Sequence, residues 1–192
     1  MSANVSEIVS SENEELILVD RDDVEIGTLN KGQCHDGDGF LHRAFSLFIF
    51  NPDGKLFLQQ RSAQKRLWPL FWSNSCCSHP RAGESMNVAM GRRLTEELGI
   101  TTTLEFVYKF AYQAKYGELG SENELCSVFL GCSDQPIRTN QSEIADSRFI
   151  STQDLQTELT RSEDRFTPWF RMEWQRLAGE FSAQLAKFAA NR

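Results

Sequence analysis

The chain has 192 residues, of which 40% are hydrophobic and 24% are charged, and its formal net charge is −7. These values are typical of an ordinary soluble globular protein, and the length suits a single domain. The acidic balance argues against a nucleic-acid partner, which would need a basic surface. No apolar run reaches the ~18–20 residues of a membrane span, so no membrane association is expected. Five cysteines without a visible signal peptide predict reduced thiols in a cytoplasmic protein.

Residues 1–14 are polar and rich in Ser and Glu, and we expect a flexible tail there, followed by one domain over residues 15–192. Apolar and alternating runs predict strands at 16–19, 24–29, 40–50, 55–61, 104–115, 122–130 and 148–150. The turn Asn51-Pro52-Asp53-Gly54 predicts that the third and fourth of these strands form a hairpin. Strand alternation places four aromatic side chains on one face: Phe106, Tyr108, Phe110 and Tyr112.

Helices are predicted over residues 85–98, near residue 152, and from Pro168 onward. Ser85 can cap the first helix, and Gly99 stands where a C-terminal glycine ends a helix. The last helix carries an apolar stripe at helical spacing: Phe170, Trp174, Leu177, Phe181, Leu185 and Phe188. Residues 62–83 are predicted to be a loop. The order of strands, helix, strands and helices indicates an α/β or α+β fold with a mixed sheet.

Histidines and carboxylates are distributed in a way that predicts a metal site. The chain contains three histidines: His35, His42 and His79. Glu122 and Glu124 are two residues apart in a predicted strand, so both carboxylates can point to the same ion. Imidazole and carboxylate ligands suit Zn²⁺, Mn²⁺ or Mg²⁺. The chain has neither the Cys-x-x-Cys pair of a zinc finger nor the His-Glu-x-x-His of a zincin.

The first predicted helix resembles the end of a Nudix box, because it reads Arg92-Arg93-Leu94-Thr95-Glu96-Glu97-Leu98-Gly99-Ile100 after Glu84. In such a box, clustered helical carboxylates hold Mg²⁺, and the ion clamps a diphosphate. Two positions depart from the pattern: Ser78 stands for a Gly, and Arg93 stands for a Glu. Arg93 removes a metal ligand and supplies a phosphate partner, which favours a diphosphate binder over a hydrolase.

Segments throughout the chain together resemble the type 1 isopentenyl-diphosphate isomerases, a family with the Nudix fold. They are His35–Ser46, Asn74–Pro80, the modified box, Glu122–Cys126 and Phe166–Trp169. The match runs in order from about residue 15 to about residue 175. It implies a Nudix-like mixed β-sheet sandwiched between helices. It also implies interconversion of isopentenyl and dimethylallyl diphosphate, a 1,3-allylic rearrangement of isoprenoid biosynthesis, with no organic cofactor.

The resemblance also implies roles for individual residues. The ligands of one divalent ion (Mn²⁺, Zn²⁺ or Mg²⁺) would be His35, His42, His79, Glu122 and Glu124. Glu97 would hold a second ion, Mg²⁺, on the substrate diphosphate. The cations around that diphosphate would be Lys31, Arg61, Lys65 and Arg93. The catalytic residues would be Cys77, Glu124, Tyr112 and Trp169.

The chemistry of the reaction agrees with these roles. Moving the double bond requires a proton added at C4 and one removed at C2, through a carbocation-like state, so a strong acid must face the alkene in a dry pocket. Glu124, with Tyr112 alongside, fits the donor, and the indole of Trp169 would stabilise the cation. Cys77 would act on the opposite side of the allyl unit. Which of Cys77 and Glu124 is the acid in each direction stays open.

Two other functions compete with this one. A Nudix-type diphosphate hydrolase would release phosphate, and a metal-binding or prenyl-diphosphate-binding module would bind without turnover. The presence of both Cys77 and Glu124 argues against the second, and Arg93 argues against the first. For the assembly we expect a monomer or a weak homodimer.

Overall fold

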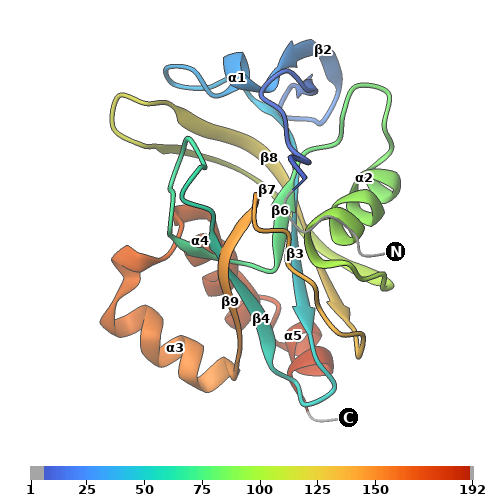
Figure 1. Cartoon of the computed structure of the whole chain (residues 1–192), viewed down its shortest axis with the longest axis vertical. Helices are drawn as coiled ribbons and strands as arrows, with labels where there is room; N and C mark the ends of the chain where they lie inside the picture. Colours follow the sequence, from blue (N-terminus) through green and yellow to red (C-terminus); the bar gives the residue numbers. More distant parts are fainter. Residues whose placement is uncertain (1–6, 191–192) are drawn as a thin grey trace.

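The structure is a computed structural model that describes residues 7–190. Within these residues, nine strands form one mixed sheet with helices on both faces (Figure 1). The strands are β1 (Glu15–Val19), β2 (Glu25–Asn30), β3 (His42–Phe50), β4 (Leu56–Arg61), β5 (Trp72–Ser73), β6 (Cys76–Ser78), β7 (Leu104–Lys115), β8 (Ser121–Cys132) and β9 (Ile144–Ile150). The α-helices are α1 (Lys31–Cys34), α2 (Met86–Arg93), α3 (Thr152–Arg161), α4 (Pro168–Ala178) and α5 (Ser182–Ala189).

Strand β3 is the centre of the sheet. It pairs antiparallel with β1, β4 and β6, and parallel with β8. Every residue of β3 except Arg43 is buried, which explains why this segment reads as a nearly continuous apolar run. The parallel register sets His42 opposite Glu124 and Phe50 opposite Cys132, so the polar end of β3 meets the polar end of β8.

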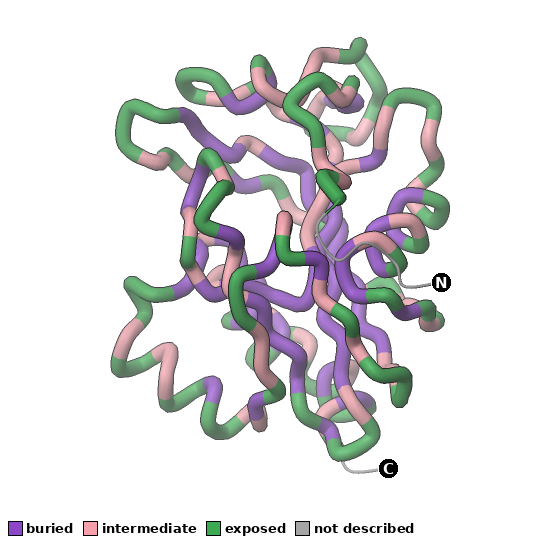
Figure 2. The backbone as a smooth tube through the Cα atoms, in the orientation of Figure 1, coloured by how far each residue is buried: buried purple, intermediate pink, exposed green. Residues whose placement is uncertain are grey.

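The two faces of β3 belong to separate apolar clusters. On one face, Phe48 stacks on Phe170 and Trp174 of α4, with ring centroids 5.9 and 6.5 Å apart. On the other face, Leu47 belongs to the cluster that holds Met90 of α2 and Leu94. Figure 2 shows the consequence, with buried residues concentrated along the central strands and exposed residues on the outer loops and helices. The predicted sandwich of helices around a mixed sheet is confirmed.

Local sequence signals place several elements correctly. Ser85 caps α2, and its side chain accepts a hydrogen bond from Val88 N. Gly99 has a positive φ of 67°, in the left-handed region that glycine adopts without strain. Between α2 and Gly99, residues Leu94–Leu98 form a wider π-helical turn. Single π-helical turns within helices are frequently found at functional sites.

The predicted hairpin of β3 and β4 is closed only at its turn, where Phe50 faces Leu56. Beyond this pair, β4 leaves β3 and pairs with β9, from Leu56 opposite Ile150 onward. The edge of β3 is taken instead by β6, because residues 62–83 contain two short strands rather than an unstructured loop. A turn motif fixes where a chain reverses, but it does not fix which strand the returning segment pairs with.

The predicted last helix is two helices, α4 and α5, separated at Gly179. Gly179 departs from helical geometry, with φ −96° and ψ −84°, and glycine is a poor helix former. The apolar stripe nevertheless continues across the break, because Leu185 and Phe188 are buried in the same cluster as Trp174. The apolar residues of the stripe are therefore buried together, although they belong to two helices.

A bulge in β7 changes the predicted aromatic face. The pairing with β8 shifts between Phe106 and Tyr108, so an extra residue is inserted in the strand. Phe106 is 53% exposed and packs edge-on against Phe129, whereas Tyr108 and Tyr112 are buried in the cluster under α4. The prediction was wrong for Phe106, because strand alternation holds only where no residue is inserted.

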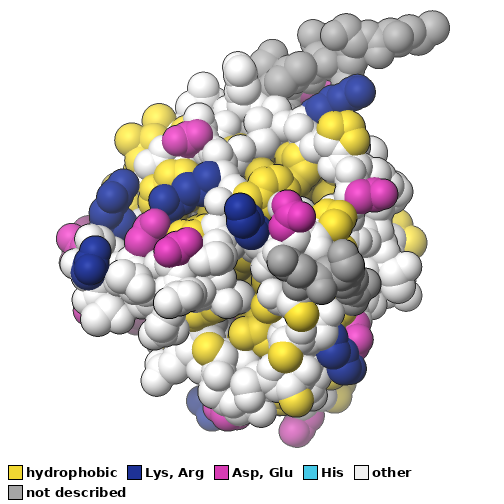
Figure 3. Space-filling model, turned by 90° about the horizontal axis from the view of Figure 1, so that it is seen from below, with side chains coloured by type: hydrophobic (Ala, Val, Ile, Leu, Met, Phe, Trp, Pro, Cys, Tyr) yellow, Lys and Arg dark blue, Asp and Glu magenta, His cyan; other side chains and the backbone are white. Residues whose placement is uncertain are grey.

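The surface agrees with the charge balance of the sequence. On the face shown in Figure 3, Lys and Arg side chains lie among Asp and Glu side chains, and no histidine of the described residues is visible. Among residues 7–190, no helix has the length and apolar character needed to cross a bilayer.

Candidate active site and metal centre

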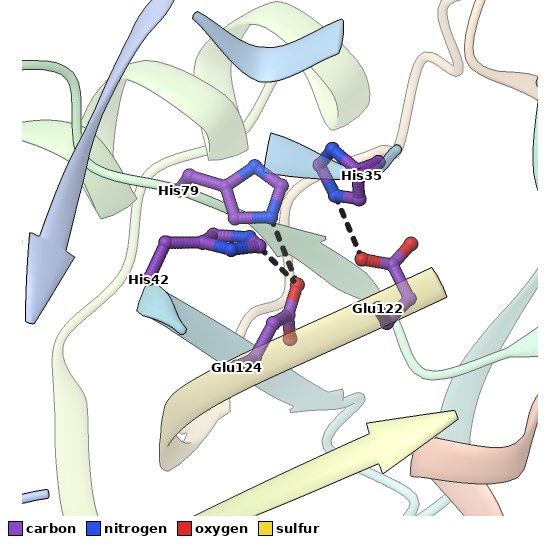
Figure 4. Close-up of side chains that lie close together, drawn as sticks. All are labelled: His35, His42, His79, Glu122 and Glu124. Atoms are coloured by element: carbon purple, nitrogen blue, oxygen red, sulfur yellow. Dashed lines mark hydrogen bonds and ion pairs between the residues drawn. The ribbon is translucent and has the colours of Figure 1, made fainter. Parts of the chain in front are cut away.

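Five side chains from separate elements converge at one end of the sheet (Figure 4). They are His35 after α1, His42 at the start of β3, His79 after β6, and Glu122 and Glu124 in β8. One ligand atom from each lies within 4.8 Å of every other. The predicted convergence is therefore present, although these residues lie far apart in the sequence. We call this group the His/Glu cage.

Backbone carbonyls orient two of the histidine rings. His35 Nδ1 lies 2.7 Å from Lys31 O, and His42 Nδ1 lies 2.7 Å from Phe40 O. Because a carbonyl can only accept, each Nδ1 carries a proton and each Nε2 faces the cage. His42 Nε2 is fully buried and has no hydrogen-bond partner among the described residues. A bound cation would satisfy this nitrogen, so the residues present fit a divalent metal ion.

Burial and close pairing determine which groups of the cage are charged. Glu122 Oε2 lies 2.8 Å from His35 Nε2. Burial alone would raise the pKa of Glu122, but His35 lowers it to about 2, so this carboxylate stays ionised. Burial also lowers the pKa of His42 to about 4. His42 is therefore neutral at physiological pH, which is the form that binds a metal.

The pKa of Glu124 is shifted in the opposite direction from the pKa of Glu122. Burial, reinforced by the nearby Glu122 carboxylate, raises the pKa of Glu124 well above its ordinary value. Tyr112 donates a hydrogen bond to Glu124 Oε2 at 2.7 Å, and His79 Nε2 lies 2.8 Å from Oε1. Two carboxyl groups with pKa values pushed apart are typical of a site that needs one proton donor and one permanent anion.

The two adjacent cysteines face opposite sides of the sheet. Cys77 lies opposite Ser46 in β3, is half-buried, and lines a pocket beside the cage. Burial raises the pKa of Cys77 to about 12, although the nearby Arg61 guanidinium acts in the opposite direction. Cys76 is fully buried, and its thiol donates to Glu97 Oε1 at 3.3 Å. Cys77 is therefore the thiol of this pair that a substrate in the pocket would meet.

One pocket contains nearly all the residues that the sequence singled out. Its lining includes the four predicted cations and four of the five cage residues, with Cys77, Tyr112, Trp169 and Leu67. The cations are Lys31, Arg61, Lys65 and Arg93. The pocket thus offers positive charge for an anionic group and an aromatic and aliphatic wall for a small hydrocarbon.

Arg61 has contacts that its sequence position did not predict. Its Nε donates to Trp68 O at 3.1 Å, and its NH2 group donates to Leu67 O at 2.9 Å. Its guanidinium carbon also lies 5.1 Å from the centre of the Trp169 ring. Trp68 has a positive φ of 47°, a strained value for a bulky residue, and Arg61 helps to hold the loop in that shape.

Glu97 lies behind the pocket rather than on its wall. Its side chain is 2% exposed, and its Oε1 lies 2.6 Å from one Arg93 nitrogen and 2.8 Å from another. Arg93 is also buried, so this departure from the Nudix box forms a tight ion pair with Glu97, one of the box's own carboxylates. An ion on a bound diphosphate would have to share Glu97 with Arg93.

Some pocket residues carried no motif signal. Glu143 precedes β9 and lines the pocket together with Arg66. Ser10 and Glu12 of the predicted tail also line it, and Ser10 Oγ accepts from Lys31 Nζ at 2.5 Å. Residues 1–6 of that predicted tail lie outside the described residues. No spacing in the sequence brings these side chains to the site, because they reach it only through the folding of distant loops.

Glu173, a residue of α4 without a predicted role, is fully buried. Cys126 Sγ lies 3.5 Å from its Oε1, and its Oε2 has no hydrogen-bond partner among the described residues. Burial raises the pKa of Glu173 to about 8. The side chain therefore keeps its proton in the folded chain at pH values where an exposed glutamate has lost it.

The comparisons with known proteins agree with this geometry. Residues 40–170 match the model of the NUDIX domain. A Deinococcus radiodurans crystal structure has a TM-score of 0.70 at 19% identity, and covers 85% of this chain and 98% of its own. A MutT protein structure from Methanosarcina mazei has a TM-score of 0.61 at 19% identity, and covers 73% of this chain and 95% of its own. The chain is a Nudix-domain protein.

Curated relatives narrow the class. Isopentenyl-diphosphate Delta-isomerase 1 of Photorhabdus laumondii is 45% identical over 84% of this chain and 93% of its own length. Isopentenyl-diphosphate Delta-isomerase of Serratia proteamaculans is 41% identical over 93% of this chain and 99% of its own length. The protein of the same name from Saccharopolyspora erythraea is 36% identical over 92% of both chains. This chain belongs to the isopentenyl-diphosphate Delta-isomerase family.

Gly120 supports the cage through its lack of a side chain. A Cβ at Gly120 would lie 2.2 Å from His35 O, whereas a Cβ at Gly117 in the same turn would have nothing within 4 Å. We expect Gly120→Ala to displace His35 and to weaken Mn²⁺ or Zn²⁺ binding at least tenfold, as measured by calorimetry on metal-free protein. Both glycines have positive φ, so Gly117→Ala controls for backbone strain. Equal metal affinities for the two variants would contradict this role of Gly120.

Glu173 should make stability depend on pH. The folded-state pKa of about 8 exceeds the ordinary value of 4.5, so its contribution is fully present below pH 4.5 and is lost as pH rises toward 8. Between pH 5 and pH 8, wild type should therefore lose about 2–4 kcal/mol of unfolding free energy relative to Glu173→Gln, which cannot ionise. Urea denaturation at both pH values measures this change. The exposed Glu180→Gln is the control, and a Glu173→Gln curve parallel to wild type would refute the assignment.

Proposed function

We propose that the protein interconverts isopentenyl diphosphate and dimethylallyl diphosphate by moving protons at the two ends of the allylic unit. The observation that carries this proposal is a single pocket in which Glu124, with a raised pKa, and the Cys77 thiol accompany four cations. A prenyl diphosphate has a matching shape, with a charged head and a five-carbon tail. The family membership of the chain supports the same activity.

In the proposed mechanism, Glu124 and Cys77 handle the two protons. Glu124 exchanges a proton at one terminal carbon, and the bond from Tyr112 to its Oε2 fixes which oxygen faces the substrate. Cys77 exchanges the other proton from β6. Trp169, in the pocket wall, offers the face of its indole to the positive charge that develops at the tertiary carbon. The apolar part of the pocket wall, formed by Leu67, Tyr112 and Trp169, would limit the water that could trap this cation.

The proposed diphosphate site is formed by the cations Lys31, Arg61, Lys65 and Arg93. Glu97 would hold the Mg²⁺ that accompanies the diphosphate, and it would share its carboxylate with Arg93, which lies 2.6 Å away. A divalent ion (Mn²⁺, Zn²⁺ or Mg²⁺) in the His/Glu cage would supply positive charge that holds Glu124 in place. The cage residues would orient Glu124 rather than attack the substrate.

The same proposal leads to expectations for the partners, the oligomeric state and the cellular compartment of the enzyme. The substrate is a small molecule, so the enzyme needs no nucleic-acid or membrane partner, and it would work as a monomer or weak homodimer. All five cysteines are free, which suits the reducing cytoplasm. A Nudix hydrolase is the alternative. The ion pair of Arg93 with Glu97 argues against it, because it occupies carboxylate that a hydrolytic helix would devote to metal.

The direct test is NMR of isopentenyl diphosphate incubated with the protein and Mg²⁺ in D₂O. We expect dimethylallyl diphosphate to form, with deuterium incorporated at C2 and C4, because proton addition and loss exchange with solvent. A sample without protein is the control. Release of phosphate or isopentenol would establish the hydrolase instead, and an unchanged spectrum after loading with Mg²⁺, Mn²⁺ and Zn²⁺ would leave only a binding module.

The role proposed for Cys77 predicts a separation of turnover from binding. We expect Cys77→Ala to lower kcat by about 10²–10⁴-fold, the usual contribution of a general acid–base group, and to leave substrate affinity within about threefold. Steady-state kinetics and calorimetry measure the two quantities. Cys132→Ala, which removes a half-buried thiol outside the pocket lining, is the matched control. Turnover near the wild-type rate in Cys77→Ala would remove this residue from the mechanism.

A further inference from the structure

Glu143 is a buried carboxylate in the pocket to which neither the sequence motifs nor the family resemblance gave a role. Its side chain is 6% exposed and lines the pocket. Its backbone is fixed on both sides, because its N–H donates to Asn140 O at 3.0 Å and its carbonyl accepts from Ser62 N at 2.8 Å. The position of this carboxylate is therefore determined by two loops that meet at the pocket.

The Glu143 carboxylate joins two of the four pocket cations. Its Oε2 accepts a hydrogen bond from Lys65 Nζ and lies 3.1 Å from an NH2 nitrogen of Arg93. Arg93 has a second carboxylate partner in Glu97, at 2.6 Å. Among the ion pairs of the described residues, Lys65 has Glu143 as its one carboxylate partner. Without Glu143, Arg93 would keep an ion pair with Glu97, whereas Lys65 would lose its ion pair.

The charge state of Glu143 fits this arrangement. Burial alone would raise its pKa, but Lys65 and Arg93 lower the pKa below the ordinary value. The group is therefore ionised at neutral pH and pairs with both cations. A lysine side chain without such a partner samples many rotamers, and ordering it when a ligand binds costs affinity.

We propose that Glu143 is a positioning residue of the diphosphate site, which holds Lys65 and Arg93 so that their remaining N–H groups face the pocket. This inference rests on the proposed function, because it takes the two cations as partners of the substrate diphosphate. Glu143 itself does not touch the substrate. It acts through Lys65 first, since Arg93 keeps its bond to Glu97.

The two possible roles of Glu143, positioning a cation or only adding negative charge, predict opposite changes in diphosphate affinity when the residue is replaced. If Glu143 only added a negative charge to the pocket, replacing it with neutral glutamine would strengthen the binding of an anion. If Glu143 positions Lys65, the same replacement weakens binding, although the pocket becomes more positive. The nearly isosteric change Glu143→Gln therefore separates the two explanations without altering the volume of the side chain.

The test is calorimetric binding of inorganic diphosphate with Mg²⁺ to the full-length protein. We expect Glu143→Gln to weaken binding about tenfold, and in turnover assays to raise KM by more than it lowers kcat. Glu143→Asp keeps the charge at shorter reach and should restore part of the affinity. Glu158→Gln, which breaks the ion pair of α3 with Arg148 outside the pocket, should bind like wild type.

A double-mutant cycle with Lys65→Ala tests whether Glu143 affects diphosphate binding through Lys65. Because Glu143 acts through Lys65, Glu143→Gln should add less than twofold to the loss caused by Lys65→Ala alone. Unchanged or tighter diphosphate binding in Glu143→Gln, or additive losses in the double variant, would overturn the proposal. If Glu143→Gln fails to fold, the Asp variant decides, and wild-type affinity in it would also overturn the proposal. Diphosphate binding can be measured whether or not the protein isomerises its substrate. Absence of turnover in wild type would therefore refute the proposed function, whereas the diphosphate affinities alone decide the role of Glu143.

Discussion

The pairing of β3 with its two neighbours is the constraint on which the site depends. Parallel pairing with β8 sets His42 opposite Glu124, and antiparallel pairing with β6 sets Cys77 opposite Ser46. A shift of one residue in either register would turn these side chains to the other face of the sheet. Because β3 is buried on both faces, apolar packing strongly favours one register. The core that stabilises the fold therefore also aligns the proposed acid Glu124, the Cys77 thiol and the proposed metal ligands.

The same burial determines the chemistry of the pocket. Removing carboxyl groups from water raises their pKa unless a partner compensates, and the outcome differs between neighbours. Glu122 has His35 beside it and stays ionised, whereas Glu124 bonds to neutral Tyr112 and has a raised pKa. One short segment of β8 thus carries one carboxylate that stays ionised and one carboxyl group with a raised pKa, which is the proposed proton donor. The difference arises from the neighbours of each residue and not from the residue type.

Sequence patterns predicted the elements whose signals are local. The cap at Ser85 and the glycine at Gly99 were placed correctly because each acts within one turn of backbone. The divergence of β4 from β3 and the bulge before Tyr108 were not predicted. Both depend on which strand competes for an edge, and this competition involves segments far apart in the chain. The break at Gly179 had a local signal, but the continuing apolar stripe favoured one helix.

The site shows the same division between local and non-local information. The family motifs singled out the residues of the His/Glu cage and the four pocket cations, because those residues lie in recognisable segments. They gave no role to Glu143, although cations crowded into a buried pocket need anions to hold them before a substrate arrives. An anion-binding pocket built from long basic side chains therefore has two parts, the cations that meet the ligand and the carboxylates that hold them in place. The second part has little sequence signature, because any loop that reaches the pocket can supply it, and only the folded structure shows which loop does.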